Sequence, residues 1–449
     1  MSGRPRRTIV TVVGGGEDDP WRLPASAETQ KTWIFGGERT MYELAVALAS
    51  VGHDVEFRGL YSRRELDEMC ADGRPRPRTD LPPRRPRADD VVIVPEGSSN
   101  PLFYARIALS PARTIMYLLA APGLFGPGIL PGFRERPALE VRPEEVSRPE
   151  HYRALRDAGF ELWTDSPAIR EDSGAAGVEC VFTGTGQMIP RVGRVERRYD
   201  VAYLADNRWA NLSRKVAAGL DASVLEIQRA PRDEVVRAMA SARVLIHPAV
   251  VEGQSRVQFE ARAVGTVTVS LRSNRYVAGI EEGGVLVDSL DDMAAEVERL
   301  LANPDELEER SRLSMRSAAR QTDWQTYVRA VGEAISAPPL EDPLRPLRAA
   351  LGDAIEVAFD ELRDRREQVA ARDGAVAWLQ GAIDEGVDRR AALEAEVRWL
   401  REVLHRRTEE RDHALRSTAA MSRRRSVRLA DRIASLIRGR RRTPGAGLR

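Results

Sequence analysis

Short apolar runs alternate with amphipathic stretches over the first three quarters of the chain. Runs such as TIVTVV (8–13) and RVLIHPA (243–249) have the length and composition of buried strands. In the stretch ERTMYELAVALASVG, Met41, Leu44 and Leu48 recur at helical spacing, which predicts an amphipathic helix. Strands that alternate with helices form parallel sheets covered by helices on both faces, so the pattern predicts an α/β fold.

The same alternation continues along the chain. A segment rich in proline and arginine (73–87) is predicted to be a surface loop, because proline blocks regular structure and the arginines repel one another. Ser166 and Pro167 are placed to begin a helix, as its cap and its first-turn residue. Further strands are predicted in DDVVIVPEG, TIMYLLA, FELWT, ECVF, YDVAYLAD, ASVLEIQ and TVTVS, and further helices in SNPLFYARIAL, SPAIRE, NLSRKVAAGL, PRDEVVRAMASA and SRVQFEARAV.

The segment 243–270 carries the most specific chemical pattern in the chain. It is predicted to form strand, turn, helix and strand, and its turn follows the carboxyl end of a parallel strand, where open α/β sheets bind ligands. Gly253 allows close backbone approach, and the free N–H groups of residues 254–256 lie at the positive end of the helix, where a phosphate can bind. Glu252 and Glu260 are then placed for the hydroxyls of a sugar or ribose. The alternative is a solvated helix face with a glutamate near its cap.

This segment resembles the sugar-nucleotide signature of the family 4 retaining glycosyltransferases, which have the two-domain GT-B fold. Their pattern E-G-F-G, four residues, E-A stands here as E-G-Q-S, four residues, E-A, with Ser255 in the place of the second glycine. The resemblance implies that Glu260 binds hydroxyls of the donor, above all those of the ribose. It implies that Glu252, the catalytic candidate, contacts the sugar or supports the developing charge. The diphosphate would be held by Gly253, Gln254, Ser255 and Arg256.

Two further stretches resemble parts of the same family. Gly36 and Gly37 stand where the family has a glycine loop that approaches the donor phosphates and the acceptor; the alternative is that they only turn the chain. The family also holds the diphosphate with an arginine and a lysine after the first strand of its second domain. The candidates here are Arg208, Arg214 and Lys215, and the alternative for each is a solvated cation. A histidine that the family often carries near the transferred sugar is absent from the matching stretch AAPGLFG.

Composition narrows the class of protein. The 449 residues suffice for two or three domains, and 42% of them are hydrophobic, so a sizeable core can form. No apolar run reaches transmembrane length and no signal peptide is predicted, so a cytoplasmic location is expected. Cys70 and Cys180 show neither metal-ligand spacing nor a disulfide framework. The net charge of +1 gives no general attraction to nucleic acid, and neither a metal nor another cofactor is expected.

The composition changes past residue 345. Residues 346–420 are charged and almost free of proline, and apolar residues recur there at heptad spacing, which favours a coiled coil that self-associates or packs on the enzyme over a single unpaired helix. The last 29 residues hold ten arginines and one acid around a narrow apolar stripe. Such a helix can lie on an anionic membrane surface, and it loosely resembles an element that follows coiled coils in bacterial surface-polysaccharide glycosyltransferases. Nucleic-acid binding is disfavoured because this segment lacks aromatic residues.

The prediction is therefore a GT-B glycosyltransferase with two Rossmann-like domains around a cleft and a helical coiled-coil extension. It would move a sugar from a nucleotide-sugar donor to a glycan, lipid-linked or other acceptor, with retention of configuration, in bacterial surface polysaccharide synthesis. It would act in the cytoplasm, peripherally on the inner face of the membrane. The alternative is an inactive GT-B scaffold that binds a sugar or a partner through its helical tail. The predicted parts are an acceptor domain (1–192), a donor domain (193–336), a linker (337–350), a helical coiled-coil region (351–420) and a basic amphipathic tail (421–449).

Overall fold

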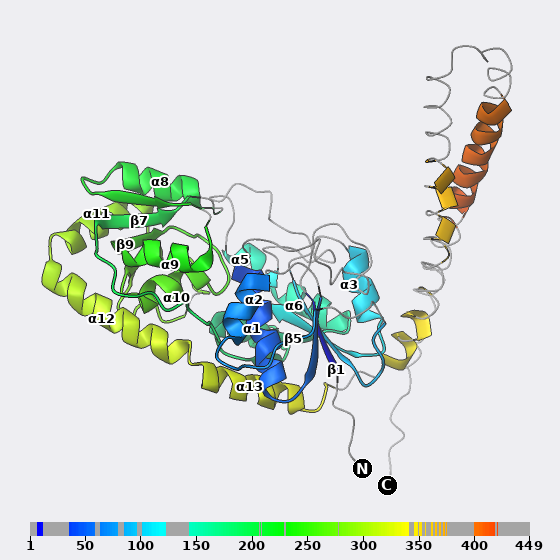
Figure 1. Ribbon diagram of the computed structural model, residues 1–449, viewed down its shortest axis with the longest axis horizontal. Helices are drawn as coiled ribbons and strands as arrows, with labels where there is room; N and C mark the ends of the chain where they lie inside the picture. Colours follow the sequence, from blue (N-terminus) through cyan, green and yellow to red (C-terminus); the bar gives the residue numbers. More distant parts are fainter. Residues whose placement is uncertain are drawn as a thin grey trace, which may run out of the picture. The chain divides into compact units, whose positions relative to one another are not determined.

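Two compact units make up the computed structural model, Met1–Val357 and Ala358–Arg449. The first unit contains two lobes, each built on a parallel sheet (Figure 1). This arrangement confirms the predicted α/β class with two Rossmann-like domains. The structure describes residues 7–11, 36–58, 63–79, 85–96, 101–122, 143–205, 207, 209–228, 230–276, 278–340, 345–348, 350–352, single positions and pairs between 355 and 374, 399–417 and 420.

The first lobe is built on a six-stranded sheet in the order β2-β1-β3-β4-β5-β6. Its strands are short apolar runs, and every residue of β3 and β4 is buried. Parallel strands covered on both faces read as continuous apolar runs, which is why the sequence pattern found them. The elements are β1 (Arg7–Thr11), α1 (Gly36–Ser50), β2 (Asp54–Arg58), α2 (Arg63–Cys70), β3 (Val91–Pro95), α3 (Pro101–Ala108), β4 (Arg113–Leu118), α5 (Pro143–Val146), α6 (Pro149–Asp157), β5 (Glu161–Thr164), α7 (Pro167–Ala175) and β6 (Cys180–Phe182).

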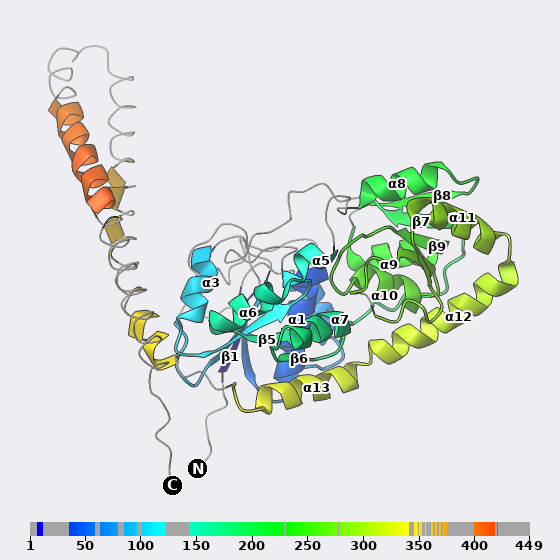
Figure 2. The same cartoon turned by 180° about the vertical axis from the view of Figure 1, so that it is seen from behind.

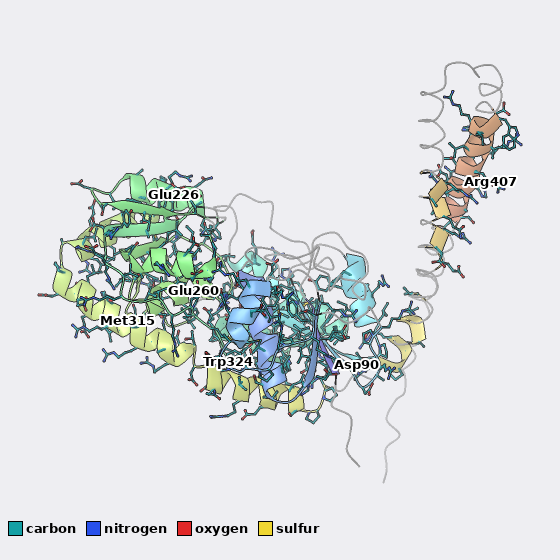
Figure 3. All side chains as sticks on the ribbon, viewed as in Figure 1. Asp90, Glu226, Glu260, Met315, Trp324 and Arg407 are labelled. Atoms are coloured by element: carbon teal, nitrogen blue, oxygen red, sulfur yellow. The ribbon has the colours of Figure 1, made fainter. Side chains whose placement is uncertain are left out.

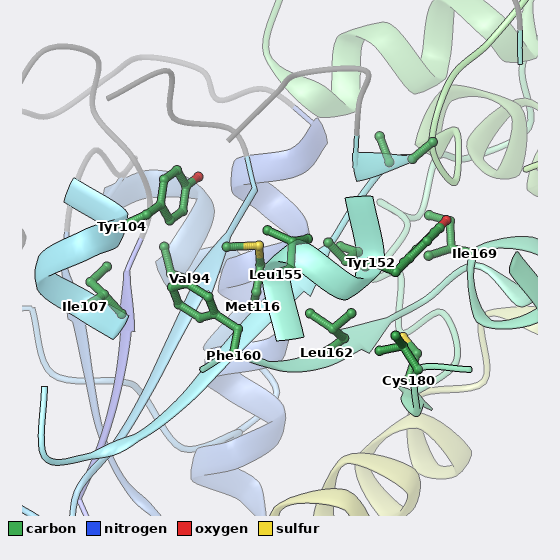
Figure 4. Packing of buried hydrophobic residues seen from close by; sticks show 14 of the residues in the cluster. Val94, Tyr104, Ile107, Met116, Tyr152, Leu155, Phe160, Leu162, Ile169 and Cys180 are labelled. Carbon is green, nitrogen blue, oxygen red and sulfur yellow. The ribbon is translucent and has the colours of Figure 1, made fainter. Parts of the chain in front are cut away.

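Alternate side chains along each strand supply a core on each face of this sheet. On β3, Val92 and Val94 belong to one apolar cluster, and Val91 and Ile93 belong to the other. Figure 4 shows the first of these clusters, which also contains Cys180. Burial raises the pKa of the Cys180 thiol to about 12, so this cysteine serves as a small apolar packing residue.

The second lobe is built on a five-stranded parallel sheet in the order β11-β10-β9-β7-β8. The chain winds outward in both directions from β7 and β9, and doubly wound sheets of this kind bind ligands outside the carboxyl ends of the strands at that point. The elements are β7 (Tyr199–Leu204), α8 (Ala210–Ala218), β8 (Val224–Ile227), α9 (Arg232–Ala240), β9 (Ala242–His247), α10 (Arg256–Ala263), β10 (Val267–Leu271), β11 (Val285–Val287) and α11 (Leu290–Leu301).

Two consecutive helices carry the chain from the second lobe back to the first (Figures 1 and 2). Helix α12 (Pro304–Gln321) packs on α10, and α13 (Trp324–Ser336) packs on α1. Both begin at side-chain caps: Asn303 accepts a hydrogen bond from the backbone N–H of Glu306, and Asp323 accepts one from Thr326. Helix α12 ends at the C-cap residue Thr322, and Asp323 caps the start of α13, so the two helices are separated at Thr322–Asp323.

Helix α13 completes the core of the first lobe. Its buried residues Tyr327, Val331 and Ile335 belong to the same apolar cluster as Leu44 and Leu48 of α1. The segment predicted as the donor domain (193–336) therefore ends in a helix that packs on the first lobe. Residues of α13 lie in the first lobe because the apolar side of this helix is buried against α1.

Most other predicted elements of the two lobes are confirmed to within a few residues. Helices α2, α5 and α6 lie in stretches for which no element was predicted. The described part of the loop predicted at 73–87 contains no helix, and its Arg78 makes one isolated bridge to Glu56. The proline and arginine content of this segment therefore correctly predicted a non-helical connection between α2 and β3.

The second unit is helical over 399–417. The pairing of helices as a coiled coil stays a prediction, and the basic tail at 421–449 lies outside the described residues. Within the part of the chain that the structure describes, no helix combines the length and apolar character needed to span a membrane.

Candidate functional site

The turn after β9 holds Glu252 in a polar cluster. His247, the last residue of β9, is buried, and its Nε2 atom lies 2.6 Å from Oε2 of Glu252 and 3.2 Å from the hydroxyl oxygen of Ser255. The backbone N–H of Glu252 donates to Oδ1 of Asn274 at 3.1 Å. The Glu252 side chain stays 33% exposed. The His247 imidazole thus orients the Glu252 carboxylate, which remains partly exposed and accessible to a ligand.

Gly253 is a point of contact between the two lobes. A Cβ atom on this residue would lie 1.7 Å from the carbonyl oxygen of Leu119, directly after β4 in the first lobe. Gly37, at the start of α1, lies beside the same leucine, since a Cβ there would meet Leu119 Cδ1 at 3.1 Å. Gly37 of the first lobe and the turn of the second lobe that contains Gly253 therefore both lie beside Leu119. Gly36 is the first residue of α1.

The chain segment that Gly253 touches is held by a buried acid that the sequence analysis missed. Glu96, directly after β3, accepts hydrogen bonds from the backbone N–H groups of Leu119 at 2.9 Å and Ala120 at 2.8 Å. Burial outweighs these two hydrogen bonds and raises the pKa of the carboxyl from 4.5 to about 7. Glu96, at the carboxyl end of β3, thus holds Leu119 and Ala120, which follow β4, in place against the second lobe.

The raised pKa of Glu96 predicts a stability that falls with rising pH. The folded protein holds this proton up to about pH 7, whereas the unfolded chain loses it near pH 4.5, so the stabilisation is complete below pH 4.5 and is lost as the pH rises through 7. We expect the free energy of unfolding to decrease by on the order of 3 kcal/mol across this window relative to Glu96→Gln. Urea unfolding at several pH values measures it, and parallel pH profiles for the two proteins would contradict it.

Arg256, predicted to hold the diphosphate, makes hydrogen bonds across the two lobes. Its guanidinium donates two hydrogen bonds to the carboxylate of Glu43 on α1, one of them at 2.8 Å, and one to the hydroxyl of Thr40 at 3.1 Å. The side chains of Arg256 and Glu43 are both at least 96% buried. Both terminal nitrogens of the Arg256 guanidinium are therefore engaged, whereas its buried Nε has no hydrogen-bond partner among the described residues.

The same pair also fixes the segment that links the lobes. Glu43 accepts a hydrogen bond from the backbone N–H of Met188 at 2.7 Å, and Arg39, one turn earlier on α1, donates to the Met188 carbonyl at 2.9 Å. Arg39 in turn donates to Glu65 of α2 at 2.6 Å. A continuous ion network thus connects α2, α1, the linking segment and α10.

Glu260 is fully buried in α10 on the side of the second lobe that faces the first (Figure 3). Its carboxylate forms an ion pair with Arg232, the first residue of α9. The Arg232 side chain is only 16% exposed. Desolvation, with Arg256 and Arg39 nearby, holds the pKa of this guanidinium well below its usual value. The predicted ribose ligand therefore has an internal cationic partner, which the sequence analysis did not identify.

The remaining predicted residues divide into two groups. Gln254 spans the lobes: its Nε2 donates to Thr185 at 3.1 Å and its Oε1 accepts from the backbone of Ala278 at 3.0 Å. Arg214 is exposed on α8 and pairs with Glu226 of β8 at 3.1 Å, and Lys215 is exposed beside it. Neither cation contacts the turn after β9 in any hydrogen bond or ion pair between described residues, and Arg208 lies outside those residues.

The first lobe adds a second buried acid beside this turn. Asp165, directly after β5, is 3% exposed, and its Oδ1 has no hydrogen-bond partner among the described residues. Burial raises the pKa of this carboxyl well above its usual value, although Arg256 opposes the shift. Its neighbour Ser166 is the N-cap residue of α7 by position, but its hydroxyl donates to the carbonyl of Tyr276 in the second lobe at 3.0 Å rather than capping the helix.

Metal ligands do not gather at this site. In the described ranges no group of three or more histidine, cysteine, aspartate or glutamate side chains is arranged to hold a metal ion. The polar groups that converge between the lobes are instead carboxylates, guanidiniums and backbone N–H groups, which suit the hydroxyls and phosphates of a nucleotide-sugar.

Residues 167–303 match the family model described as glycosyl transferases group 1. No curated protein matches the chain. Among solved structures, sucrose-phosphate synthase from Thermosynechococcus elongatus is 12% identical with a TM-score of 0.49, over 74% of this chain and 98% of that one. WaaG, a glycosyltransferase involved in lipopolysaccharide biosynthesis, is 15% identical with a TM-score of 0.46, over 74% and 100%. Anabaena HepE, in complex with UDP-glucose, is 12% identical with a TM-score of 0.45, over 73% and 99%.

The matched segment runs from α7 to just past α11, so it contains the whole second sheet and the turn with Glu252 and Glu260. Both glutamates and their partners Arg232, His247 and Asn274 therefore belong to the part of the chain that carries the family likeness. Residues 167–303 therefore match the glycosyl transferases group 1 model, in a chain whose first unit consists of two lobes built on parallel sheets.

Proposed function

We propose that the protein is a glycosyltransferase that moves a sugar from a nucleotide-sugar donor to a hydroxyl-bearing acceptor. The observation that carries this proposal is the turn and helix after β9, where Glu252 and Glu260 lie inside the glycosyltransferase group 1 match and face the first lobe. The donor binds to the second lobe, and the acceptor approaches from the first lobe, beside Gly37 and Asp165.

Glu260 receives the ribose hydroxyls of the donor, and Arg232 is the internal ion-pair partner of this buried carboxylate. The diphosphate lies at the start of α10, where the first backbone N–H groups have no intrahelical acceptor and Ser255 makes no side-chain cap. Glu252, oriented by His247, lies against the sugar and stabilises the positive charge that develops at its anomeric carbon.

The reaction exchanges one bond at the anomeric carbon. The bond to the diphosphate breaks and the bond to the acceptor oxygen forms, while fixed backbone dipoles stabilise the departing diphosphate. Contact between the lobes at Gly253 excludes water from the reacting atoms. We propose that no metal takes part and that the configuration at the anomeric carbon is retained, as the family resemblance implies.

The second unit and the tail are assigned to location and assembly. We propose that the helical unit mediates self-association, and that the arginine-rich tail holds the enzyme reversibly on an anionic membrane surface in the cytoplasm. A lipid-linked or glycan acceptor in surface polysaccharide synthesis is consistent with that location.

The proposal is tested by substitution of Glu260. Replacing this buried carboxylate with glutamine removes a charged acceptor, worth on the order of 1.5–3 kcal/mol, so we expect nucleoside diphosphate-sugar binding to weaken by about 10- to 150-fold. Calorimetry with a panel of nucleotide-sugars measures it. The double variant Glu260→Gln/Arg232→Gln, which leaves no unpaired guanidinium, is expected to bind as weakly as the single variant.

The control is Glu234→Gln, an exposed acid on α9 whose replacement is expected to leave donor affinity unchanged. If parent and Glu260→Gln bind every tested nucleotide-sugar equally, Glu260 is not the donor ligand. Lys215→Ala and Arg214→Ala form a second arm. A loss specific to nucleoside diphosphates in these variants would place the diphosphate over α8 instead of at the start of α10.

A binding protein without transfer activity is the second candidate function. It is favoured by the internal ion pairs of Arg256 and Glu260, since both side chains already have partners within the protein. Hydrolysis of a bound nucleotide-sugar without acceptor separates the two candidates. Slow release of nucleoside diphosphate indicates a transferase, whereas tight binding without release indicates a binding protein.

A further inference from the structure

The turn after β10 places an asparagine beside Glu252. The Oδ1 atom of Asn274 accepts the hydrogen bond from the backbone N–H of Glu252 at 3.1 Å, and Asn274 is buried. The backbone N–H of Asn274 itself donates to the carbonyl of Leu271, the last residue of β10, at 3.2 Å. The turns that follow the neighbouring strands β9 and β10 are therefore joined at the carboxyl edge of the second sheet.

The amide nitrogen of Asn274 has no acceptor within the described protein. Rotating the amide would turn Nδ2 toward the backbone N–H of Glu252, so the hydrogen bond to Oδ1 fixes which way the group points. Nδ2 then lies buried without a hydrogen-bond partner among the described residues. Burying an N–H donor without an acceptor is unfavourable, so an oxygen atom supplied by a ligand would stabilise this arrangement.

A second unpartnered group lies on the same face of the sheet. Ser270 of β10 pairs in register with His247 of β9, and residues in register on parallel strands project from the same face. The hydroxyl of Ser270 is buried and has no hydrogen-bond partner among the described residues, whereas the His247 imidazole contacts Glu252. The end of β10 and its turn thus add two groups with unused hydrogen-bonding capacity to the cluster around Glu252.

The turn that contains Asn274 also contacts the first lobe. Its next residue, Arg275, forms an ion pair with Asp172 of α7, and the carbonyl of Tyr276 accepts a hydrogen bond from Ser166, just after β5. Asn274 therefore lies between the turn after β9 and the lobe that is proposed to bring the acceptor. A transferred sugar has to lie between these two parts, because its anomeric carbon exchanges the diphosphate for the acceptor oxygen.

We propose that Nδ2 of Asn274 binds a hydroxyl of the transferred sugar, adjacent on the ring to the hydroxyl that binds Glu252. This inference rests on the proposed glycosyl transfer. A carboxylate only accepts hydrogen bonds and an amide nitrogen only donates them, whereas a hydroxyl does both. Two adjacent sugar hydroxyls therefore match the pair, since one donates to Glu252 and its neighbour accepts from Asn274. The donor is thus a nucleotide-sugar with a free vicinal diol, and a sugar that lacks either hydroxyl is disfavoured.

The test measures sugar binding separately from nucleotide binding. Calorimetry of the full-length protein with UDP-glucose, ADP-glucose and GDP-mannose, each beside its nucleoside diphosphate, gives the contribution of the sugar. Asn274→Asp keeps the oxygen that accepts from Glu252 and removes the N–H donor. We expect it to weaken binding of the preferred nucleotide-sugar by about tenfold and to leave the affinity for the nucleoside diphosphate unchanged. Asn211→Asp, the same change at an exposed position on α8, is the control and is expected to bind as the parent does.

Analogues of the preferred nucleotide-sugar that lack each ring hydroxyl in turn add a measurement on the parent protein alone. Loss of the hydroxyl that Asn274 binds is expected to weaken binding to the parent by about tenfold and to leave binding to Asn274→Asp unchanged. A displaced turn would not produce this coupling between one hydroxyl and one side chain. A parent protein that binds every deoxy analogue as tightly as the complete sugar overturns the inference, even if the variant does not fold.

Failure of this inference is distinguishable from failure of the proposed function. If the parent binds a nucleotide-sugar and Asn274→Asp binds it equally well, the contact with Asn274 is wrong and the donor site remains. The same conclusion follows if the variant loses affinity equally for the nucleotide-sugar and for the nucleoside diphosphate, because the change then acts on the whole turn. If the parent binds none of the three nucleotide-sugars, both the proposed function and the contact with Asn274 are overturned.

Discussion

Replacing Glu43 with glutamine is expected to lower the free energy of unfolding by about 3 kcal/mol or more. The carboxylate is the bidentate partner of Arg256, and both side chains are almost completely buried, so the substitution leaves an uncompensated guanidinium between the lobes. It also removes the charged acceptor for the backbone of Met188 in the linking segment. Urea unfolding followed by tryptophan fluorescence, to which Trp163, Trp209 and Trp324 of the first unit contribute, measures the loss.

Two comparisons isolate the pair. Glu226→Gln removes the partner of Arg214 in an exposed ion pair, and a loss below about 1 kcal/mol is expected there. The double variant Glu43→Gln/Arg256→Gln should lose less than the sum of the two single variants, because neither charge is then left alone. A Glu43→Gln protein within 1 kcal/mol of the parent would show that this ion pair does not hold the lobes together.

Gly253→Ala is expected to reduce transfer by about 100-fold, the cost of displacing reacting groups by roughly 1 Å. The backbone angles of this residue suit alanine, so strain within the turn is not the cause. The new Cβ would instead collide with the carbonyl oxygen of Leu119. The backbone N–H of the same residue donates to the Glu96 carboxylate, which fixes this segment in place. Either the two lobes must then move apart, or the turn that contains Gly253 must shift. Steady-state rates of nucleoside diphosphate release with acceptor present provide the measurement.

The matched control is Gly174→Ala in α7, where a Cβ meets no atom within 4 Å. This variant is expected to keep full activity and to gain up to about 1 kcal/mol of stability, because alanine restricts the unfolded chain more than glycine does. Full activity in Gly253→Ala would mean that the contact between Gly253 and Leu119 is not made during the reaction.

The strands and most helices of the two lobes were predictable because their signals are local. Buried parallel strands such as β3 and β9 are short apolar runs. In α1 and α10, apolar residues recur at helical spacing. The packing of α13 was not predictable in this way. Its apolar side fits either lobe equally well by pattern alone, and only the tertiary structure assigns Tyr327 and Val331 to the first core.

The candidate site was predictable in its position but not in its partners. The turn with Glu252 and Glu260 is a local pattern at a strand end, and the structure places it where the lobes meet. The ion pairs join residues 28 positions apart in Arg232–Glu260 and 213 apart in Arg256–Glu43, so no spacing rule reveals them. One feature of the sequence could have indicated Arg232. It is a cation at the first position of a helix that follows a strand, and such a position suits an anionic site.

The return of α13 to the first lobe affects the order in which the protein can be made and folded. The cluster around Leu44 and Leu48 of α1 includes Tyr327, Val331 and Ile335, so residues almost three hundred positions apart share one core. During synthesis the ribosome must release the entire second lobe before the first lobe can bury this surface. The second lobe is contiguous in sequence from β7 to α12. It is thus expected to fold before the first lobe, whose core is complete only when α13 has been synthesised.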